Sequence, residues 1–161
     1  MLPKYVPRKG FFRFAPQAQM NFYPHTKLIN NHSIGIQYDQ TNAPGIGMTD
    51  NIAGVNWNVT TQQSVLFGLI LSNNYTYLFN DFDPTLGGNL SLKAGSEYRY
   101  TNLQAYYFSD QRKRFATQTS LTVGGYFNGS LFSVSGALAY RFQPFGSFTL
   151  NYSYNKIDLP P

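Results

Sequence analysis

The chain has 161 residues, a net charge of +5, and 17% aromatic against only 12% charged residues. Intrinsic disorder requires high charge and few aromatic residues, while coiled coils and helical bundles are rich in Ala, Glu, Lys and Leu, so this composition argues against these classes. The chain contains no cysteine, which rules out a disulfide scaffold, a thiolate metal site and cysteine catalysis. Abundant Phe, Tyr and Thr favour β-strands instead.

Eight segments of roughly ten residues, separated by turn signals, show alternation of apolar and polar residues along the chain. Successive side chains of a strand point to opposite faces, so a period of two predicts a strand. Pro16 lies inside the first segment and predicts a weak strand or a bulge there. We expect no helix and no domain break. The predicted strands are 11–23, 33–39, 52–60, 65–78, 97–109, 115–127, 132–142 and 147–155.

The connections between these segments differ in length. The third, fifth and seventh connections are short, whereas the second (Thr41 to Asp50) and the fourth (Phe79 to Lys93) are long and contain Gly, Pro, Asn and Asp. Asn128-Gly129 predicts a two-residue hairpin turn, because both positions accept a positive φ. In an up-and-down meander the short and long sets emerge at opposite ends, which is typical of an outer-membrane barrel.

Two folds compete for such alternating strands. In a soluble sandwich or barrel the apolar face points inward and the polar face is solvated, whereas in an outer-membrane barrel the apolar face contacts lipid. The polar face here consists of Ser, Thr, Asn, Gln and Gly, although a soluble surface is roughly 25–35% charged. The sequence therefore favours an all-β antiparallel meander of about eight strands, forming an outer-membrane β-barrel or an arc of a larger one.

Tyrosines near the predicted strand ends support the membrane alternative. A tyrosine ring is apolar and its hydroxyl stays hydrated, so this residue suits the membrane–water interface. The longest apolar run, Val65 to Leu71, is far too short for a membrane-spanning helix of about 20 residues. The predicted interface residues are Tyr75, Tyr77, Tyr140, Tyr152 and Tyr154.

Several motifs occur in the order found in a known family. They are Val6–Phe12, Tyr98–Asn102, Ser109–Phe115, Tyr126–Gly129, Tyr140–Pro144 and Tyr154–Pro160. With them the chain resembles the uncharacterised outer-membrane β-barrel domain of Bacteroidetes surface proteins that carry a family-nine-like carbohydrate-binding module. The resemblance implies location in the outer membrane of a Gram-negative bacterium.

That family also has a leading signal peptide, the carbohydrate-binding module and closing strands. The first nine residues contain no apolar core of a signal peptide. We therefore expect residues 1–161 to be a single barrel segment, truncated at both ends. Members of the family are often labelled hydrolases, and a glycan partner is implied only through the module.

The acidic residues offer weak candidates for a metal site. Asp81 and Asp83 lie in the longest predicted loop, and oxygen-rich loops can bind calcium. Asp at these positions before Pro84 is also ordinary turn chemistry. The carboxylate pair that glycoside hydrolysis requires is not identifiable among seven scattered acids, so we expect no catalytic residue in this chain and no cofactor.

The charged candidate residues outside the long loops form two groups. Arg112, Lys113 and Arg114 lie in a short turn, where they are candidates for binding lipid phosphate or form a solvated hairpin tip. Glu97, Arg99 and Arg141 lie inside strands, and we assign them to the polar face, where they line the lumen of a barrel or face solvent in a soluble protein. The basic run is too short to indicate a nucleic-acid partner.

These observations predict a barrel segment that anchors a carbohydrate-binding or surface module in outer-membrane lipid and passes small solutes. One alternative is a soluble β-barrel or sandwich that binds an apolar ligand or a glycan. Another is part of a carbohydrate-active hydrolase. The oligomeric state is not predicted.

Overall fold

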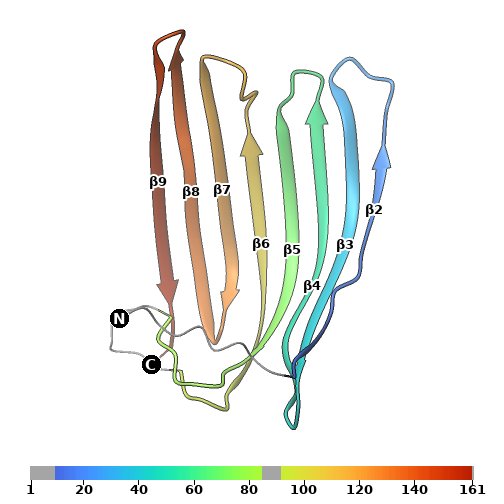
Figure 1. Ribbon diagram of the computed structural model, residues 1–161, viewed down its shortest axis with the longest axis vertical. Helices are drawn as coiled ribbons and strands as arrows, with labels where there is room; N and C mark the ends of the chain where they lie inside the picture. Colours follow the sequence, from blue (N-terminus) through green and yellow to red (C-terminus); the bar gives the residue numbers. More distant parts are fainter. Residues whose placement is uncertain (1–9, 85–91, 161) are drawn as a thin grey trace.

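The computed structural model describes residues 10–84 and 92–160, and within them it is an all-β structure without helices. Nine antiparallel strands form one meander-like sheet that does not close, in the order β1-β3-β4-β5-β6-β7-β8-β9, with β2 also paired to β3 (Figure 1). The predicted fold class is thus confirmed as an open up-and-down sheet. The strands are β1 (Phe12–Phe14), β2 (Gln17–Phe22), β3 (Ile29–Ala43), β4 (Gly47–Thr61), β5 (Leu66–Tyr77), β6 (Glu97–Phe108), β7 (Phe115–Tyr126), β8 (Gly129–Phe142) and β9 (Gly146–Asp158).

The strands β1 and β2 occupy one edge position beside β3 and are separated at Ala15 and Pro16. Proline has no N–H to donate to a ladder, which explains why the segment that was predicted to be weak or bulged here is divided into two strands. The Pro16 carbonyl still accepts a hydrogen bond from the Tyr38 backbone N–H at 3.0 Å, so the chain stays attached to β3.

The hairpin connections lie at two ends of the sheet, which we name by their place in Figure 1. The upper end holds connections 23–28, 62–65, 109–114 and 143–145, and the lower end holds 44–46, 78–96 and 127–128. Of the connection 78–96, residues 78–84 and 92–96 are described. Part of the predicted loop Phe79–Lys93 and residues 6–9 of the Val6–Phe12 motif lie outside the described residues.

The predicted long loop Thr41–Asp50 is wrong. The ladder between β3 and β4 continues to the pair Ala43–Gly47 after a register shift, leaving only three residues in the turn. Thr49 is fully buried and its hydroxyl donates to the Thr41 carbonyl at 3.2 Å. The polar residues that resemble a loop in sequence are paired strand residues, so the lower end has one long connection and two tight ones.

The two-residue hairpin between β7 and β8 is present, but it is shifted by one residue from the predicted Asn128-Gly129. Tyr126 pairs with Gly129, so the turn consists of Phe127 and Asn128, and the positive φ of 52° falls on Phe127. The ring of Phe127 packs near Tyr98, at a centroid distance of 5.4 Å. Aromatic packing therefore accompanies an unfavourable backbone conformation at a residue with a bulky side chain.

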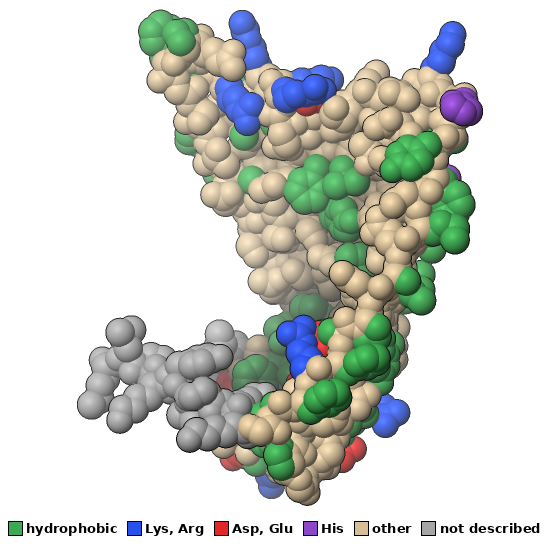
Figure 2. Space-filling view, turned by 45° about the vertical axis from the view of Figure 1, so that its right-hand side comes forward, with side chains coloured by type: hydrophobic (Ala, Val, Ile, Leu, Met, Phe, Trp, Pro, Cys, Tyr) green, Lys and Arg blue, Asp and Glu red, His purple; other side chains and the backbone are tan. Residues whose placement is uncertain are grey.

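The sheet is curved, and within residues 10–84 and 92–160 no second layer packs on it. Figure 2 shows a hollow whose wall contains few hydrophobic side chains, whereas hydrophobic side chains line the outer side of its right-hand edge. Among the described residues the buried hydrophobic set is small and contains three alanines. It comprises Ala43, Tyr75, Leu78, Leu92, Ala116 and Ala137.

A glycine in the middle of the sheet allows a side chain to cross one strand. A Cβ on Gly68 would lie 2.3 Å from Cζ of Tyr106, so the tyrosine ring occupies the space above this glycine. The ring thereby reaches across β5, and its hydroxyl donates a hydrogen bond to Asn58 on β4. This contact ties together β4, β5 and β6 on the polar face.

We expect Gly68→Ala to lower the free energy of unfolding by about 1–3 kcal/mol, because the added methyl group displaces the Tyr106 ring. Gly146→Ala is the matched control, since its Cβ meets the Phe142 ring at an ordinary 3.4 Å. Urea-induced unfolding followed by Trp57 fluorescence measures both. Equal effects of the two substitutions would show that the Tyr106 ring does not depend on the space above Gly68.

Candidate functional site

The ladder register places the large apolar side chains on one face of the sheet. Cross-strand partners lie on the same face, and the pairing can be followed from β3 to β9 without a break. One such row runs through Ile34, Trp57, Leu69, Ala105, Leu121, Val134 and Tyr154. We call the face that carries this row the apolar face and the other the polar face.

The apolar face is exposed over most of its extent. Trp57 is 41% exposed and Leu71 52%, although soluble monomers rarely leave a contiguous apolar patch larger than a few hundred Å² uncovered. On the described strands, the charged residues of this face all lie near the lower end. They are Glu97, Arg99, Lys156 and Asp158.

The prediction that Glu97 and Arg99 lie on the polar face is wrong. Arg99 pairs with Tyr75 and Glu97 with Tyr77, so both charged residues share the apolar face. The guanidinium of Arg99 lies over the Tyr75 ring, 5.2 Å from its centroid. Tyrosines on both faces of β6 hide the alternation in the sequence, which explains the misassignment.

The candidate interface tyrosines do not form one set. Tyr75 and Tyr77 lie at the lower end of β5, and Tyr140 lies near the upper end of β8. Tyr152 and Tyr154 also lie on the apolar face, but within β9 rather than at its end. The assumption that these last two mark a strand end is therefore wrong, because β9 extends to Asp158.

The polar face is a network of neutral hydrogen-bonding side chains. Asn58 donates to Asn56 at 3.2 Å and accepts from Tyr106, while Gln104 donates to Ser120 at 3.0 Å. Ser133 donates to the Asn155 side chain at 2.6 Å. A hollow of about 250 Å³ on this face is lined by Phe108, Gln118, Thr119, Ser120, Ser135 and Gly136.

Charged groups on the polar face are few. Arg141 is one of them, opposite Ser147 on β9. Sequence reasoning missed the ion pair of Arg13 with Asp39, in which Nε donates to Oδ1 at 2.8 Å. Arg13 reaches Asp39 because β1 pairs with β3 in a particular register, and the sequence of the interrupted first segment does not reveal that register.

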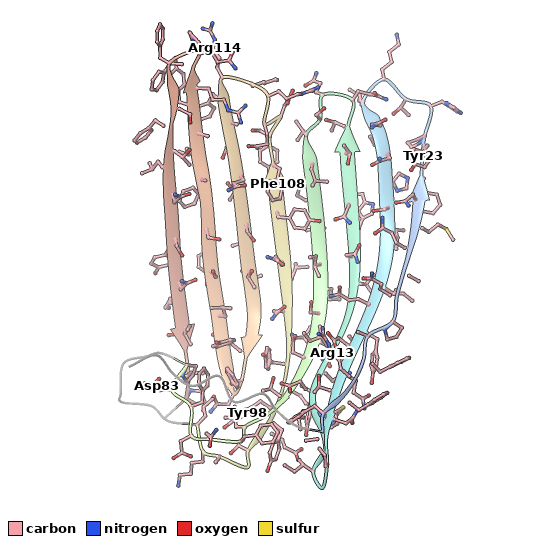
Figure 3. The ribbon with its side chains drawn as sticks, in the orientation of Figure 1. Arg13, Tyr23, Asp83, Tyr98, Phe108 and Arg114 are labelled. Atoms are coloured by element: carbon pink, nitrogen blue, oxygen red, sulfur yellow. The ribbon has the colours of Figure 1, made fainter. Side chains whose placement is uncertain are left out.

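The long connection at the lower end carries both candidate metal ligands. Asp81 Oδ1 accepts a hydrogen bond from the Ala94 backbone N–H at 2.8 Å, which is the turn-stabilising role weighed against calcium binding. Asp83 lies at the lower end in Figure 3. Among the described residues, no group of three or more His, Cys, Asp or Glu side chains is arranged to hold a metal ion.

An aromatic cluster packs where this connection meets the β7–β8 turn. Phe82 lies 5.6 Å from Phe127 between ring centroids, and Phe127 also contacts Tyr98, Tyr100 and Tyr126. Phe82 and Leu92 exchange backbone hydrogen bonds of 2.9 and 2.8 Å, which fixes the two described parts of the connection to each other. The long connection is thus held at the lower end by packing.

At the upper end, Arg112 connects two turns. Its Nε and Nη2 donate to the Asp110 carboxylate at 2.9 and 3.1 Å, and Nη2 also donates to Ser64 Oγ at 2.8 Å. The side-chain and backbone hydrogen bonds from Arg112 lower the pKa of Asp110 from 3.8 to about 2. Lys113 and Arg114 follow in the same turn and are exposed.

Comparisons with known proteins find no matching family model, no similar curated protein and no similar solved structure. The resemblance to the Bacteroidetes barrel domain therefore stays a prediction. No helix within residues 10–84 and 92–160 is long and apolar enough to cross a membrane.

We expect the Asp110 carboxyl to titrate at about pH 2, measured by carbon NMR, and Arg112→Gln to move this value back toward 3.8. Because the pKa is lower in the folded state, the stabilisation is complete above about pH 3.8 and disappears as the pH falls through about 2. Asp110→Asn should therefore reduce stability at neutral pH and have little effect in strong acid. An Asp110 pKa near 3.8 in the unaltered chain would contradict the role of Arg112.

Proposed function

We propose that this sheet forms the wall of an outer-membrane β-barrel, with its apolar face against lipid and its polar face toward a lumen. The exposed apolar face carries this proposal, because its charged residues on the described strands are confined to the lower end. In water such a face drives aggregation, whereas in a bilayer it is the surface that lipid chains contact.

The strand lengths support a membrane-spanning arrangement. The strands β5, β6 and β7 have 12 residues each, and β3 and β4 have 15. At about 3.3 Å per residue, 12 residues extend about 40 Å, which at a tilt of about 45° spans about 28 Å. This span is close to the hydrocarbon thickness of a bilayer, about 30 Å.

The free edges of the sheet determine how such a barrel is completed. Among the described residues, β1 and β2 on one edge and β9 on the other have a neighbouring strand on one side only. Unpaired backbone groups are not tolerated in the hydrocarbon region, so these edges have to pair with each other or with added strands. The proposal therefore includes closure of the sheet in the membrane.

Apart from its few charged groups, the polar face is lined by neutral side chains, which favours passage of small solutes as the role of the lumen. Amide and hydroxyl groups such as those of Asn56, Gln104 and Ser120 hydrate a channel without selecting strongly by charge. Anchoring of a surface module, with a glycan as its ligand, rests on the family resemblance alone. The soluble alternative requires a further layer to cover the apolar face, and the hydrolase alternative requires acids other than Asp81, which is engaged with Ala94.

The single tryptophan provides a direct test of which face meets lipid. Trp57 lies on the apolar face and is 41% exposed. After the chain is refolded into vesicles, brominated acyl chains should quench Trp57 fluorescence strongly, and aqueous iodide should quench it weakly. The opposite order, or a monodisperse β-fold in plain buffer, would overturn the membrane assignment.

Neighbouring residues in the middle of β5 provide a matched pair of substitutions. Leu71 lies on the apolar face and Ser72 on the polar face. In a barrel, Leu71→Lys should reduce the free energy of unfolding from vesicles by about 2–4 kcal/mol, because it places a charge near the bilayer midplane. Ser72→Lys should have a much smaller effect, because its charge reaches the hydrated lumen.

The urea midpoint of refolded protein, read by heat-modifiable gel mobility, measures both substitutions. If Leu71→Lys were neutral, or Ser72→Lys the more damaging of the two, the two faces would have to be exchanged or the membrane location abandoned. If the protein is soluble instead, Leu71→Lys on the exposed apolar face should improve solubility at little cost in stability.

A further inference from the structure

The two ends of the sheet differ in charge. In the described part of the chain, the upper end has five basic side chains and the single acid Asp110, whereas the lower part has the remaining six acids and four basic side chains. Figure 2 shows several Lys and Arg side chains along the upper end and others, near Asp and Glu, in the lower part. The basic residues of the upper end are Lys27, Arg112, Lys113, Arg114 and Arg141.

Within this basic end, Arg114 and Arg141 lie directly opposite each other on adjacent strands. The Arg141 backbone N–H donates to the Arg114 carbonyl at 2.7 Å, which continues the register of the pair Phe115–Tyr140. Directly opposite residues have Cβ atoms roughly 4.5–5.5 Å apart and share a face, so two positive charges are held side by side. Figure 3 places Arg114 at the upper tip of the sheet.

No described carboxylate compensates this pair. The only acid at the upper end, Asp110, is bound by Arg112, and neither Arg114 nor Arg141 forms an ion pair with a described residue. Like charges directly opposite each other in a sheet are destabilising. Two adjacent uncompensated guanidinium groups are therefore a site that an anion would stabilise.

We propose that Arg114 and Arg141 together bind a phosphate group, either from a lipid headgroup or free in solution. Guanidinium groups present paired N–H donors that match the oxygens of a phosphate, and two of them can hold it from two sides. Ser147, opposite Arg141 on β9, adds a hydroxyl on the same face. The inference of a phosphate site depends on the strand register that brings the two arginines together, and only binding to a lipid headgroup rests on the proposed membrane function.

The test uses the full chain refolded in zwitterionic detergent micelles and the unfolding midpoint in urea. At matched ionic strength, replacing chloride with inorganic phosphate should raise the midpoint of the unaltered chain. The rise should disappear in the double variant Arg114→Gln/Arg141→Gln and should shrink in Arg114→Lys, which keeps the charge and loses the paired donors. Lys156→Gln at the lower end is the control and should keep the full rise.

A second measurement protects the test against a folding defect. Without phosphate, the double variant should be at least as stable as the unaltered chain, because the substitution removes the repulsion between the arginines. In the lipid arm, vesicles of phosphatidylcholine are compared with vesicles that also contain phosphatidylglycerol. A gain from phosphatidylglycerol without one from inorganic phosphate assigns the site to lipid, and the reverse assigns it to free phosphate.

The proposal is overturned if neither arm distinguishes the double variant from the unaltered chain, or if Lys156→Gln loses the rise equally. A chain that is monodisperse in buffer without detergent would contradict the membrane function. The phosphate titration can then be repeated in that buffer, so the two failures are distinguishable.

Discussion

The continuous hydrogen-bonded ladder from β3 to β9 is the constraint on which the rest of the structure depends. Each strand is paired on both sides except at the edges, so every side chain is assigned to one of two faces by its position alone. No second layer formed by the described residues covers either face. The burial of apolar surface that usually stabilises a domain must therefore come from an environment outside the sheet, and lipid chains supply it in the proposed barrel.

Local contacts stabilise the two ends of this sheet in different ways. At the lower end, packing dominates, with Phe127 at the centre of the aromatic cluster and Leu92 buried within the long connection. At the upper end, polar contacts dominate, with Arg112 joining two turns through Asp110 and Ser64. The ends thus differ in chemistry as well as in charge, which gives the sheet a direction along its strands.

The existence and order of the strands could be predicted from the sequence, because strand alternation is a local property of neighbouring residues. The ends of the strands could not. Thr49 resembles a loop residue, yet it is fully buried in β4, since cross-strand pairing outweighs the turn preference of the Thr and Asn residues around it. The one-residue shift of the turn to Phe127 likewise depends on tertiary aromatic contacts.

For the candidate site, the polarity of the two faces could be predicted from the sequence, but the face on which some charged residues lie could not. The polarity of the two faces follows from alternation in β8, where Ser133 and Ser135 alternate with Phe132 and Val134. The faces of Glu97 and Arg99 depend on the register with β5, which no single strand encodes. The same is true of the opposed pair Arg114 and Arg141, because only the register between β7 and β8 shows that these two residues lie side by side.

The number of edge-to-edge positions has a topological consequence. Since β1 and β2 share one position, the sheet contains eight strand positions, an even number. The strands at the first and last positions therefore run in opposite directions. Phe12, which begins β1, and Asp158, which ends β9, consequently lie at the same end of the sheet. In a membrane, any segment joined before β1 and any segment joined after β9 would emerge into the same compartment. If this sheet closes onto itself, every strand pair remains antiparallel. If further strands complete the barrel, their number has to be even for every pair to remain antiparallel.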